Sequence, residues 1–174
     1  MCIGRSVRRF IALIALVSGS AALAHMIPAN TGTLRLVTDK AYVVMGVPSS
    51  ALFEKDRLVD GAVSEEAYGL FQSEVRSLVG AGIGLDCGGS ALALLDLRLQ
   101  PEVHYQNESG WVAQVTAMLI FAVPDKPCRL RFETALYGPP EAALTVNMRV
   151  TAAESVRYFE LTSSNSFFEV DYQP

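Results

Sequence analysis

The stretch Trp111-Val-Ala-Gln-Val-Thr-Ala-Met-Leu-Ile-Phe121 decides the fold that we expect for this chain. Its odd-numbered positions are apolar throughout, whereas Gln114 and Thr116 lie on the opposite side. An alternation with a period of two is typical of a β-strand that buries one face. This stretch is the longest strand that the sequence predicts.

Shorter strands with the same alternation flank this one. One is predicted over Ala91–Leu99 and another over Arg129–Tyr137, where apolar and charged residues take turns. The polar connection Gln100–Gly110 is predicted to be a long hairpin loop, and Pro124–Pro127 a turn. Strands joined in this order favour an antiparallel meander.

The region before the meander predicts further strands and then a helix. Residues 34–47 are rich in apolar and β-branched side chains and indicate two short strands or one bent strand, interrupted at Asp39-Lys40. Ser64 can cap a helix, and apolar residues then recur along one stripe as far as Gly80. The segment 50–63 between them is expected to be a loop that can include one helical turn.

The last third of the chain allows two interpretations. Helical spacing favours a helix over residues 146–162, although a strand at 143–150 followed by a shorter helix fits the pattern nearly as well. The aromatic tail 167–172 alternates weakly, and it can add a strand to the edge of this sheet or of a partner's sheet.

These elements together predict an α+β fold. We expect an antiparallel sheet of about four to five strands, with two helices packed on one face. The layout is similar in outline to small envelope proteins that act as adaptors or accessory subunits.

Residues 1–24 read as a secretory signal peptide. Three arginines precede the apolar run Phe10–Val17, and the small-residue triplet Ala22-Leu23-Ala24 is typical of a cleavage site. The run is too short to span a bilayer, which needs about 20 apolar residues. We therefore expect a secreted or periplasmic protein with no transmembrane segment after cleavage, a flexible leader at 25–32 and a single domain at 33–174.

Charge and cysteine content narrow the function classes. Eleven basic and 18 acidic residues follow Ala24, so the mature chain carries a formal charge of −7, which argues against nucleic-acid binding. Cys87 and Cys128 are the two cysteines of the mature chain, and in an oxidising compartment they predict a disulfide. In the chain-entropy model such a loop of roughly 40 residues contributes about 4 kcal/mol.

Two histidines suggest one specific chemistry. Cleavage after Ala24 would expose His25 as the first residue, and His104 lies in the predicted hairpin loop. A free amine and two imidazoles are nitrogen ligands suited to copper. The pattern resembles the histidine brace of lytic polysaccharide monooxygenases and periplasmic copper-binding proteins, and this resemblance implies copper as a cofactor.

Residues for other chemistry are sparse. The glycine-rich run Gly80–Gly84 follows a helix, whereas a dinucleotide-binding loop precedes one. Paired carboxylates can act as a general acid and a general base. Weak candidates for such a pair are Asp96, Glu102 and Glu133, which lie on or beside neighbouring predicted strands.

We therefore expect no catalytic residues, and we expect an exported non-enzymatic binding or adaptor protein of the cell envelope, which binds an unidentified protein or small ligand. The alternatives are a copper-binding protein that uses His25 and a structural accessory subunit of an envelope complex. Asn107-Glu108-Ser109 also matches an N-glycosylation acceptor, which matters only in a host that glycosylates.

Overall fold

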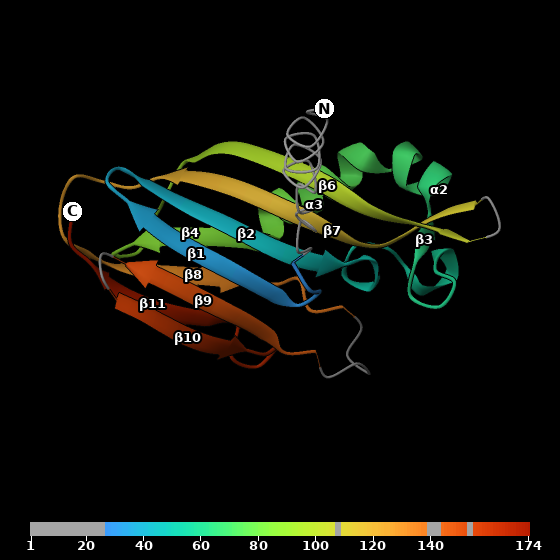
Figure 1. Ribbon diagram of the computed structural model, residues 1–174. Helices are drawn as coiled ribbons and strands as arrows, with labels where there is room; N and C mark the ends of the chain where they lie inside the picture. The colour runs from blue at the N-terminus through green and yellow to red at the C-terminus, as the bar shows by residue number, and fades with distance from the viewer. Residues whose placement is uncertain (1–26, 107–108, 139–143, 153–154) are drawn as a thin grey trace, which may run out of the picture.

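The computed structural model describes residues 27–106, 109–138, 144–152 and 155–174 (Figure 1). The predicted signal peptide and His25 lie outside these residues, as do Asn107 and Glu108 of the glycosylation pattern. The described chain is 59% strand and 17% helix, arranged in two sheets of seven and four strands. The prediction of one four-to-five-stranded sheet with two helices on one face is therefore wrong.

The larger sheet contains both the earliest and some of the latest strands of the chain. Its order is β10-β9-β1-β2-β7-β3, with β6 paired to the other edge of β7. Strand β1 runs parallel to β9, and the remaining pairs are antiparallel. The strands are β1 (Thr31–Val37), β2 (Lys40–Pro48), β3 (Val63–Ser64), β6 (Leu94–Gln106), β7 (Ser109–Ala122), β9 (Val146–Ala152) and β10 (Ser155–Leu161).

The smaller sheet lies behind the larger one in Figure 1 and has the order β11-β8-β4-β5. Its strands are β4 (Ile83–Cys87), β5 (Ser90–Ala91), β8 (Cys128–Thr134) and β11 (Phe167–Tyr172). The aromatic tail thus pairs with a strand of its own chain, β8, as one of the two expected arrangements had it.

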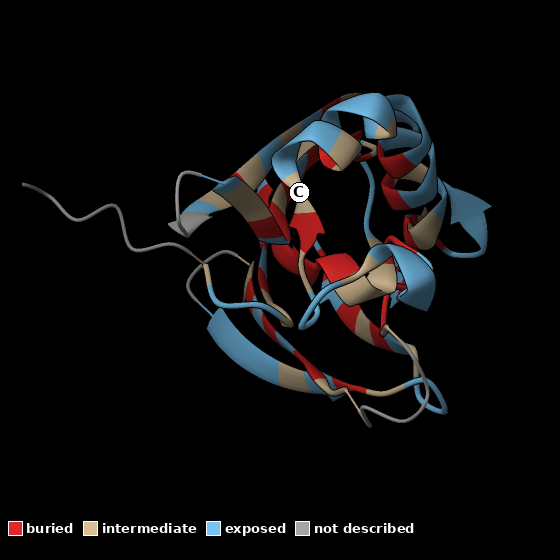
Figure 2. Cartoon of the chain, turned by 90° about the vertical axis from the view of Figure 1, so that its right-hand side faces the viewer, coloured by how far each residue is buried: buried red, intermediate tan, exposed pale blue. Residues whose placement is uncertain are grey.

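Two helices connect the sheets. Helix α2 (Glu65–Leu70) begins after Ser64, whose Oγ accepts a hydrogen bond from the Ala67 amide at 3.2 Å, as expected for a helix cap. Helix α3 (Gln72–Gly82) follows after a break at Phe71 and ends close to the predicted Gly80. Figure 2 shows both helices exposed on their outer side, with buried residues on the side toward the sheets.

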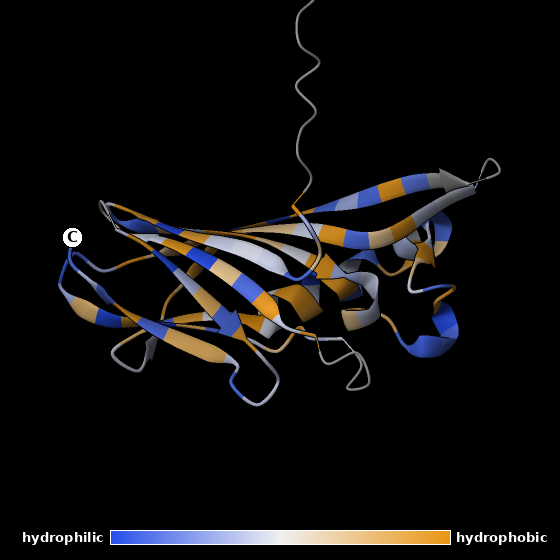
Figure 3. Ribbon diagram, turned by 60° about the horizontal axis from the view of Figure 1, so that its bottom comes forward, coloured by the Kyte–Doolittle hydropathy of each residue, from blue (hydrophilic) through white to orange (hydrophobic). Residues whose placement is uncertain are grey.

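The core lies between the two sheets. Every second residue of β1 is buried, and β2 follows the same alternation as far as Met45, after which the strand is buried through Pro48. Hydrophobic and hydrophilic residues alternate as bands along strands in Figure 3. Aromatic rings join the sheets at one edge: Phe159 of β10 stacks on Phe168 of β11 with centroids 4.2 Å apart, and Phe168 stacks on Phe132 of β8 at 5.1 Å. A two-sheet sandwich follows, because each sheet covers the apolar face of the other.

The meander prediction is correct for β6 and β7 but wrong for β8. The predicted loop Gln100–Gly110 is mostly strand, because β6 pairs with β7 from Leu94 to Gln106, with register shifts after Leu94 and after Glu102. The next strand, β8, leaves this sheet and pairs with β4 and β11. Its fully buried Leu130 and Phe132 form part of the core that the larger sheet also faces.

The helix predicted over 146–162 is also wrong. Residues 146–152 and 155–161 form the antiparallel hairpin β9–β10, so the alternative of a strand near 143–150 was correct for its strand and wrong for the helix after it. Val146, Met148 and Val150 are all buried, as a strand with one inner face requires. Pairing with β1 supplies the non-local partner that the local helical spacing cannot reveal.

Candidate functional site

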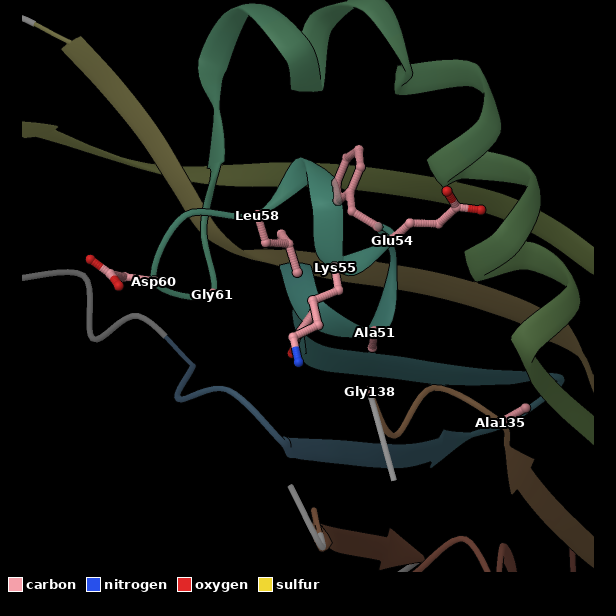
Figure 4. A pocket seen from close by; sticks show the side chains of 10 residues that line it. Ala51, Glu54, Lys55, Leu58, Asp60, Gly61, Ala135 and Gly138 are labelled. Carbon is pink, nitrogen blue, oxygen red and sulfur yellow. The ribbon is translucent and has the colours of Figure 1, made fainter. Parts of the chain in front are cut away.

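A hollow of about 590 Å³ lies at one end of the sandwich (Figure 4). Residues 50–61 form one wall, and Ala135 and Gly138 after β8 form the other. The hollow therefore lies where a loop of the larger sheet meets the chain leaving the smaller one. Loops held by a rigid sandwich in this way are common locations for binding sites.

Hydrogen bonds of Ser49 attach the start of the first wall, residues 50–61, to the larger sheet. Pro48 ends β2, and a short 3-10 helix, η1 (Ser49–Ala51), follows. The fully buried Ser49 hydroxyl donates to the carbonyl of Val112 on β7 at 2.7 Å. The Ser49 carbonyl accepts from the Phe53 amide at 2.9 Å, which directs the buried Phe53 ring inward. The wall is thus anchored to β7, which lies between β2 and β6 in the larger sheet.

A tight turn completes this wall. A second short helix, η2 (Lys55–Arg57), leads into paired hydrogen bonds between Val59 and Ala62 at 2.9 and 3.0 Å. Asp60 and Gly61 between them have φ of 51° and 80°, the left-handed conformation that such turns require.

The charged side chains around the hollow differ in direction. Figure 4 shows Lys55 reaching over the hollow, while the carboxylates of Glu54 and Asp60 point away to opposite sides. Arg57 is occupied elsewhere, with its guanidinium 4.1 Å from the centre of the Phe71 ring. Lys55 is therefore the cation that faces the space above the apolar lining, which consists of Ala51, Phe53, Leu58 and Ala135.

Tyr137 lies between Ala135 and Gly138, the two residues of the second wall, and is buried. Burial, and then the negative charge of Glu133, raise the pKa of Tyr137 to about 12. Its hydroxyl makes no hydrogen bond within the described residues. The phenol therefore stays neutral over the physiological range.

Residues 56–67 have a loop-then-helix arrangement with the spacing of a calcium-binding EF-hand loop. Asp56, Asp60 and Gly61 match its first, fifth and sixth positions. Leu58 and Ala67 stand at the third and twelfth, where the loop needs oxygen ligands. The turn geometry is present without those ligands, so we assign no calcium site to it.

A polar cluster occupies the outer face of the larger sheet. The side chain of Glu102 on β6 is buried, and its two carboxylate oxygens accept from the Gln114 amide at 2.5 Å and the Thr116 hydroxyl at 2.8 Å. The same Gln114 nitrogen donates to the carbonyl of Ile27 at 2.8 Å. Residue 27, which the sequence places in a flexible leader, is thus bonded to the sheet beside a carboxylate.

His104 lies close to this cluster along the strand. It is part of β6 rather than of a loop, it pairs with Trp111, and it lines a shallow hollow of about 450 Å³. Residues two apart on a strand share a face, so His104 and Glu102 both belong to the outer face. Its expected copper partner, His25, lies outside the described residues, and within them no group of three or more metal-ligating side chains occurs.

The other sequence candidates are not brought together. Asp96 forms an exposed ion pair with Arg98 at 2.9 Å, and Glu133 pairs with Arg131 at 3.0 Å in the other sheet. The three carboxylates Asp96, Glu102 and Glu133 therefore do not form one site.

The predicted disulfide is present: Cys87 at the end of β4 is bonded to Cys128 at the start of β8.

No sequence pattern predicts the hollow at Lys55, because residues 50–63 are irregular in periodicity and meet Ala135 and Gly138 only in the folded chain. None of the helices in the described ranges has the length and apolarity needed to cross a bilayer.

No protein-family model matches the sequence, and no curated protein matches it either.

Proposed function

We propose that this chain is an exported, non-enzymatic binding protein that holds a small ligand with an apolar body and an anionic group. The observation that carries the proposal is the hollow of about 590 Å³ with one inward-reaching cation, Lys55. Small-molecule sites typically measure about 300–1,000 Å³ and combine an apolar lining with a few polar groups.

The chemistry of the lining supports this ligand class. The Phe53, Leu58 and Ala51 side chains offer apolar contact to a ring or a short alkyl chain. Lys55 offers an ammonium group that would pair with a carboxylate, sulfonate or phosphate. The mature chain carries a net negative charge, which disfavours an anionic group at most of its surface. An anionic ligand is therefore expected to bind at Lys55 rather than elsewhere.

Export is part of the proposal. The basic and apolar segment at residues 1–24 supports cleavage and transfer to the envelope or beyond, and the Cys87–Cys128 disulfide is compatible with an oxidising compartment. A sandwich with a disulfide in one sheet suits a protein that must keep a preformed site outside the cytoplasm.

The test uses the fluorescent probe 1-anilinonaphthalene-8-sulfonate, which has an aromatic body and one anionic group. The mature, oxidised protein should bind one probe molecule, and Lys55→Gln should raise the dissociation constant about tenfold, which corresponds to about 1.4 kcal/mol. Lys55→Arg should retain most of the affinity. Lys126→Gln removes an exposed lysine outside the hollow and is the matched control.

Equal affinity of the Lys55→Gln and Lys126→Gln variants would contradict the proposal. A second variant, Ala51→Trp, fills the hollow without changing charge and should abolish binding. If the probe still bound to Ala51→Trp, its site would lie elsewhere on the chain.

We propose copper binding through the mature N-terminus as a second candidate function. One observation favours it: Ile27, two residues after His25, is bonded to Gln114 on the same sheet face as His104. Two residues of chain span up to about 7 Å, so a mature N-terminus could stay near this face.

Copper titration of the mature protein tests this candidate. A 1:1 complex should form, and both His25→Ala and His104→Ala should weaken it, because each removes one imidazole ligand. An added N-terminal glycine should weaken it as well, since it displaces the free amine from His25. Unchanged copper affinity in His25→Ala would eliminate the candidate.

A further inference from the structure

A groove of about 530 Å³ crosses the outer face of the larger sheet. Strands β1, β9 and β10, which lie side by side in Figure 1, form its floor. The strand register arranges six outward-facing residues of the floor in two rows, which are Thr31, Asn147 and Glu160 in one row and Thr33, Arg149 and Tyr158 in the other. Neighbouring strands are about 5 Å apart and the two rows about 7 Å apart, so the floor measures about 10 Å by 7 Å.

The start of the described chain forms a wall on one side of this groove, where Ile27 and Pro28 line it. The Ile27 carbonyl accepts a hydrogen bond from the Gln114 side-chain amide at 2.8 Å. The Thr31 hydroxyl donates to the Pro28 carbonyl at 2.7 Å. These hydrogen bonds hold the wall on the sheet, so the groove is preformed, as is usual for small-molecule sites.

Tyr158 gives the groove an aromatic surface. It is 76% exposed, more than any other large hydrophobic residue in the described chain. It lies opposite Arg149 of β9 on the outer face, whereas the ring of its neighbour Phe159 stacks on Phe168 toward the other sheet. An aromatic side chain has only two torsions to fix, so it offers contact area at a low cost in conformational entropy. The Tyr158 ring is therefore open to stacking from the solvent side.

The polar side chains of the groove include one cation and one anion. Arg149 and Glu160 are both exposed, and neither belongs to an ion pair among the described residues. They are diagonal neighbours, because Arg149 faces Tyr158 and Glu160 faces Asn147. Their charges balance, so the lining carries no net formal charge. Each of them can still form charge-assisted hydrogen bonds with neutral groups, and Asn147 adds an amide donor and an acceptor.

We propose that this groove binds a neutral saccharide, at a site separate from the hollow at Lys55. A pyranose ring has a face of C–H groups, which lies on the Tyr158 ring, and an edge of hydroxyl groups, which both donate and accept hydrogen bonds. Arg149 donates to these hydroxyls, and Glu160 accepts from them. An anion or a cation fits this lining less well, because one of the two charges would repel it. The inference does not rest on the ligand proposed for the hollow.

The experiment titrates the isotopically labelled mature protein with four neutral hexasaccharides, which are cellohexaose, maltohexaose, mannohexaose and chitohexaose. NMR follows the backbone amides. At least one hexasaccharide should bind with a dissociation constant of about 1 mM or less, and the amides of β9 and β10 should shift. Raising the NaCl concentration from about 50 mM to about 500 mM should leave the affinity unchanged, because neither the ligand nor the lining carries a net charge.

Variants of two tyrosines on the same sheet face locate the site. Tyr158→Ala should raise the dissociation constant about tenfold, because it removes the stacking surface. Tyr158→Phe should retain most of the affinity, since stacking needs the ring and not the hydroxyl. Tyr42→Ala is the matched control, because Tyr42 of β2 is exposed on the same face and does not line the groove.

Three results would overturn the proposal. The first is that none of the four hexasaccharides binds at about 10 mM. The second is that the Tyr158→Ala and Tyr42→Ala variants bind with equal affinity. The third is that glycylglycine, a zwitterion with both charges and no sugar ring, binds in the groove while the hexasaccharides do not.

The outcome is separable from the test of the hollow. Lys55→Gln should leave the affinity for the hexasaccharide unchanged, because Lys55 does not line the groove. Tyr158→Ala should leave the binding of 1-anilinonaphthalene-8-sulfonate at the hollow unchanged, because Tyr158 does not line the hollow. Failure of one site is thus distinguished from failure of the other.

Discussion

At the scale of single residues, close backbone approach explains a glycine that the sequence leaves unremarked. Gly46 lies in the middle of β2, where an added Cβ would meet the Pro28 carbonyl at 2.5 Å. Gly84 lies in β4 and would meet no heavy atom within 4 Å. A close backbone contact thus requires glycine at position 46, whereas no such contact requires it at position 84.

Gly46→Ala should therefore destabilise the protein by about 1–3 kcal/mol, the cost of overpacking a well-packed site. Gly84→Ala is the matched control and should change stability by no more than about 0.5 kcal/mol. Urea denaturation curves of both variants check the difference. Equal midpoints would show that residue 28 does not press on β2 in solution.

Tyr137 should make stability fall at high pH. Its pKa is raised to about 12 in the folded protein, against about 10 in the unfolded chain, so the folded state holds the proton longer. The stabilisation is complete below pH 10 and is lost as the pH rises from 10 to 12. Tyr137→Phe should show a smaller loss between pH 9 and pH 11.

The check on Tyr137 is the urea midpoint at the two pH values. At neutral pH the variant should be at least as stable as the parent, because it removes a buried hydroxyl that has no partner in the described chain. Tyr42→Phe, at an exposed position, should retain the full loss at high pH.

At the scale of elements, the disulfide holds two neighbouring strands of the smaller sheet. Cys87 ends β4 and Cys128 begins β8, and the Gly88 amide donates to the Arg129 carbonyl at 2.9 Å just beyond them. Between the two cysteines the chain forms the whole β6–β7 hairpin of the other sheet. The bond therefore closes a loop that passes through both layers of the sandwich.

Replacing both cysteines with alanine should lower the free energy of unfolding by about 4 kcal/mol in the chain-entropy model, within a general range of about 2–5. The comparison of urea denaturation with and without a reducing agent measures the same quantity in the parent protein. A change below about 1 kcal/mol would mean that the unfolded chain keeps these strands together without the bond.

At the scale of the whole molecule, distant parts of the chain form the sheets. The first strand, β1, pairs with β9 through Thr31 and Asn147, and the last strand, β11, pairs with β8. Such pairings require the closure of long loops before any stabilising contact forms.

Refolding should consequently be slow, in the millisecond-to-second range typical of all-β domains dominated by non-local pairs. Trp111, the only tryptophan of the chain, is a probe for stopped-flow fluorescence of the oxidised protein. Refolding within microseconds would contradict the observed topology.

The sequence by itself determined features that depend on neighbours along the chain. The alternation over 111–121 predicted the long strand β7, and Ser64 predicted the start of helix α2. Two cysteines after a predicted signal peptide predicted their disulfide. Each of these depends on local geometry or on simple counting, which is why residue order was enough.

Only the tertiary structure decided how the strands divide into two sheets. Residues 146–162 carry both a helical and an alternating pattern, and pairing with β1 selects the hairpin. The burial of Glu102 beneath residue 27 and the meeting of Lys55 with Ala135 also join parts that are far apart in sequence. Hydrogen bonding and burial between distant segments leave no local period, so the sequence pattern could not reveal them.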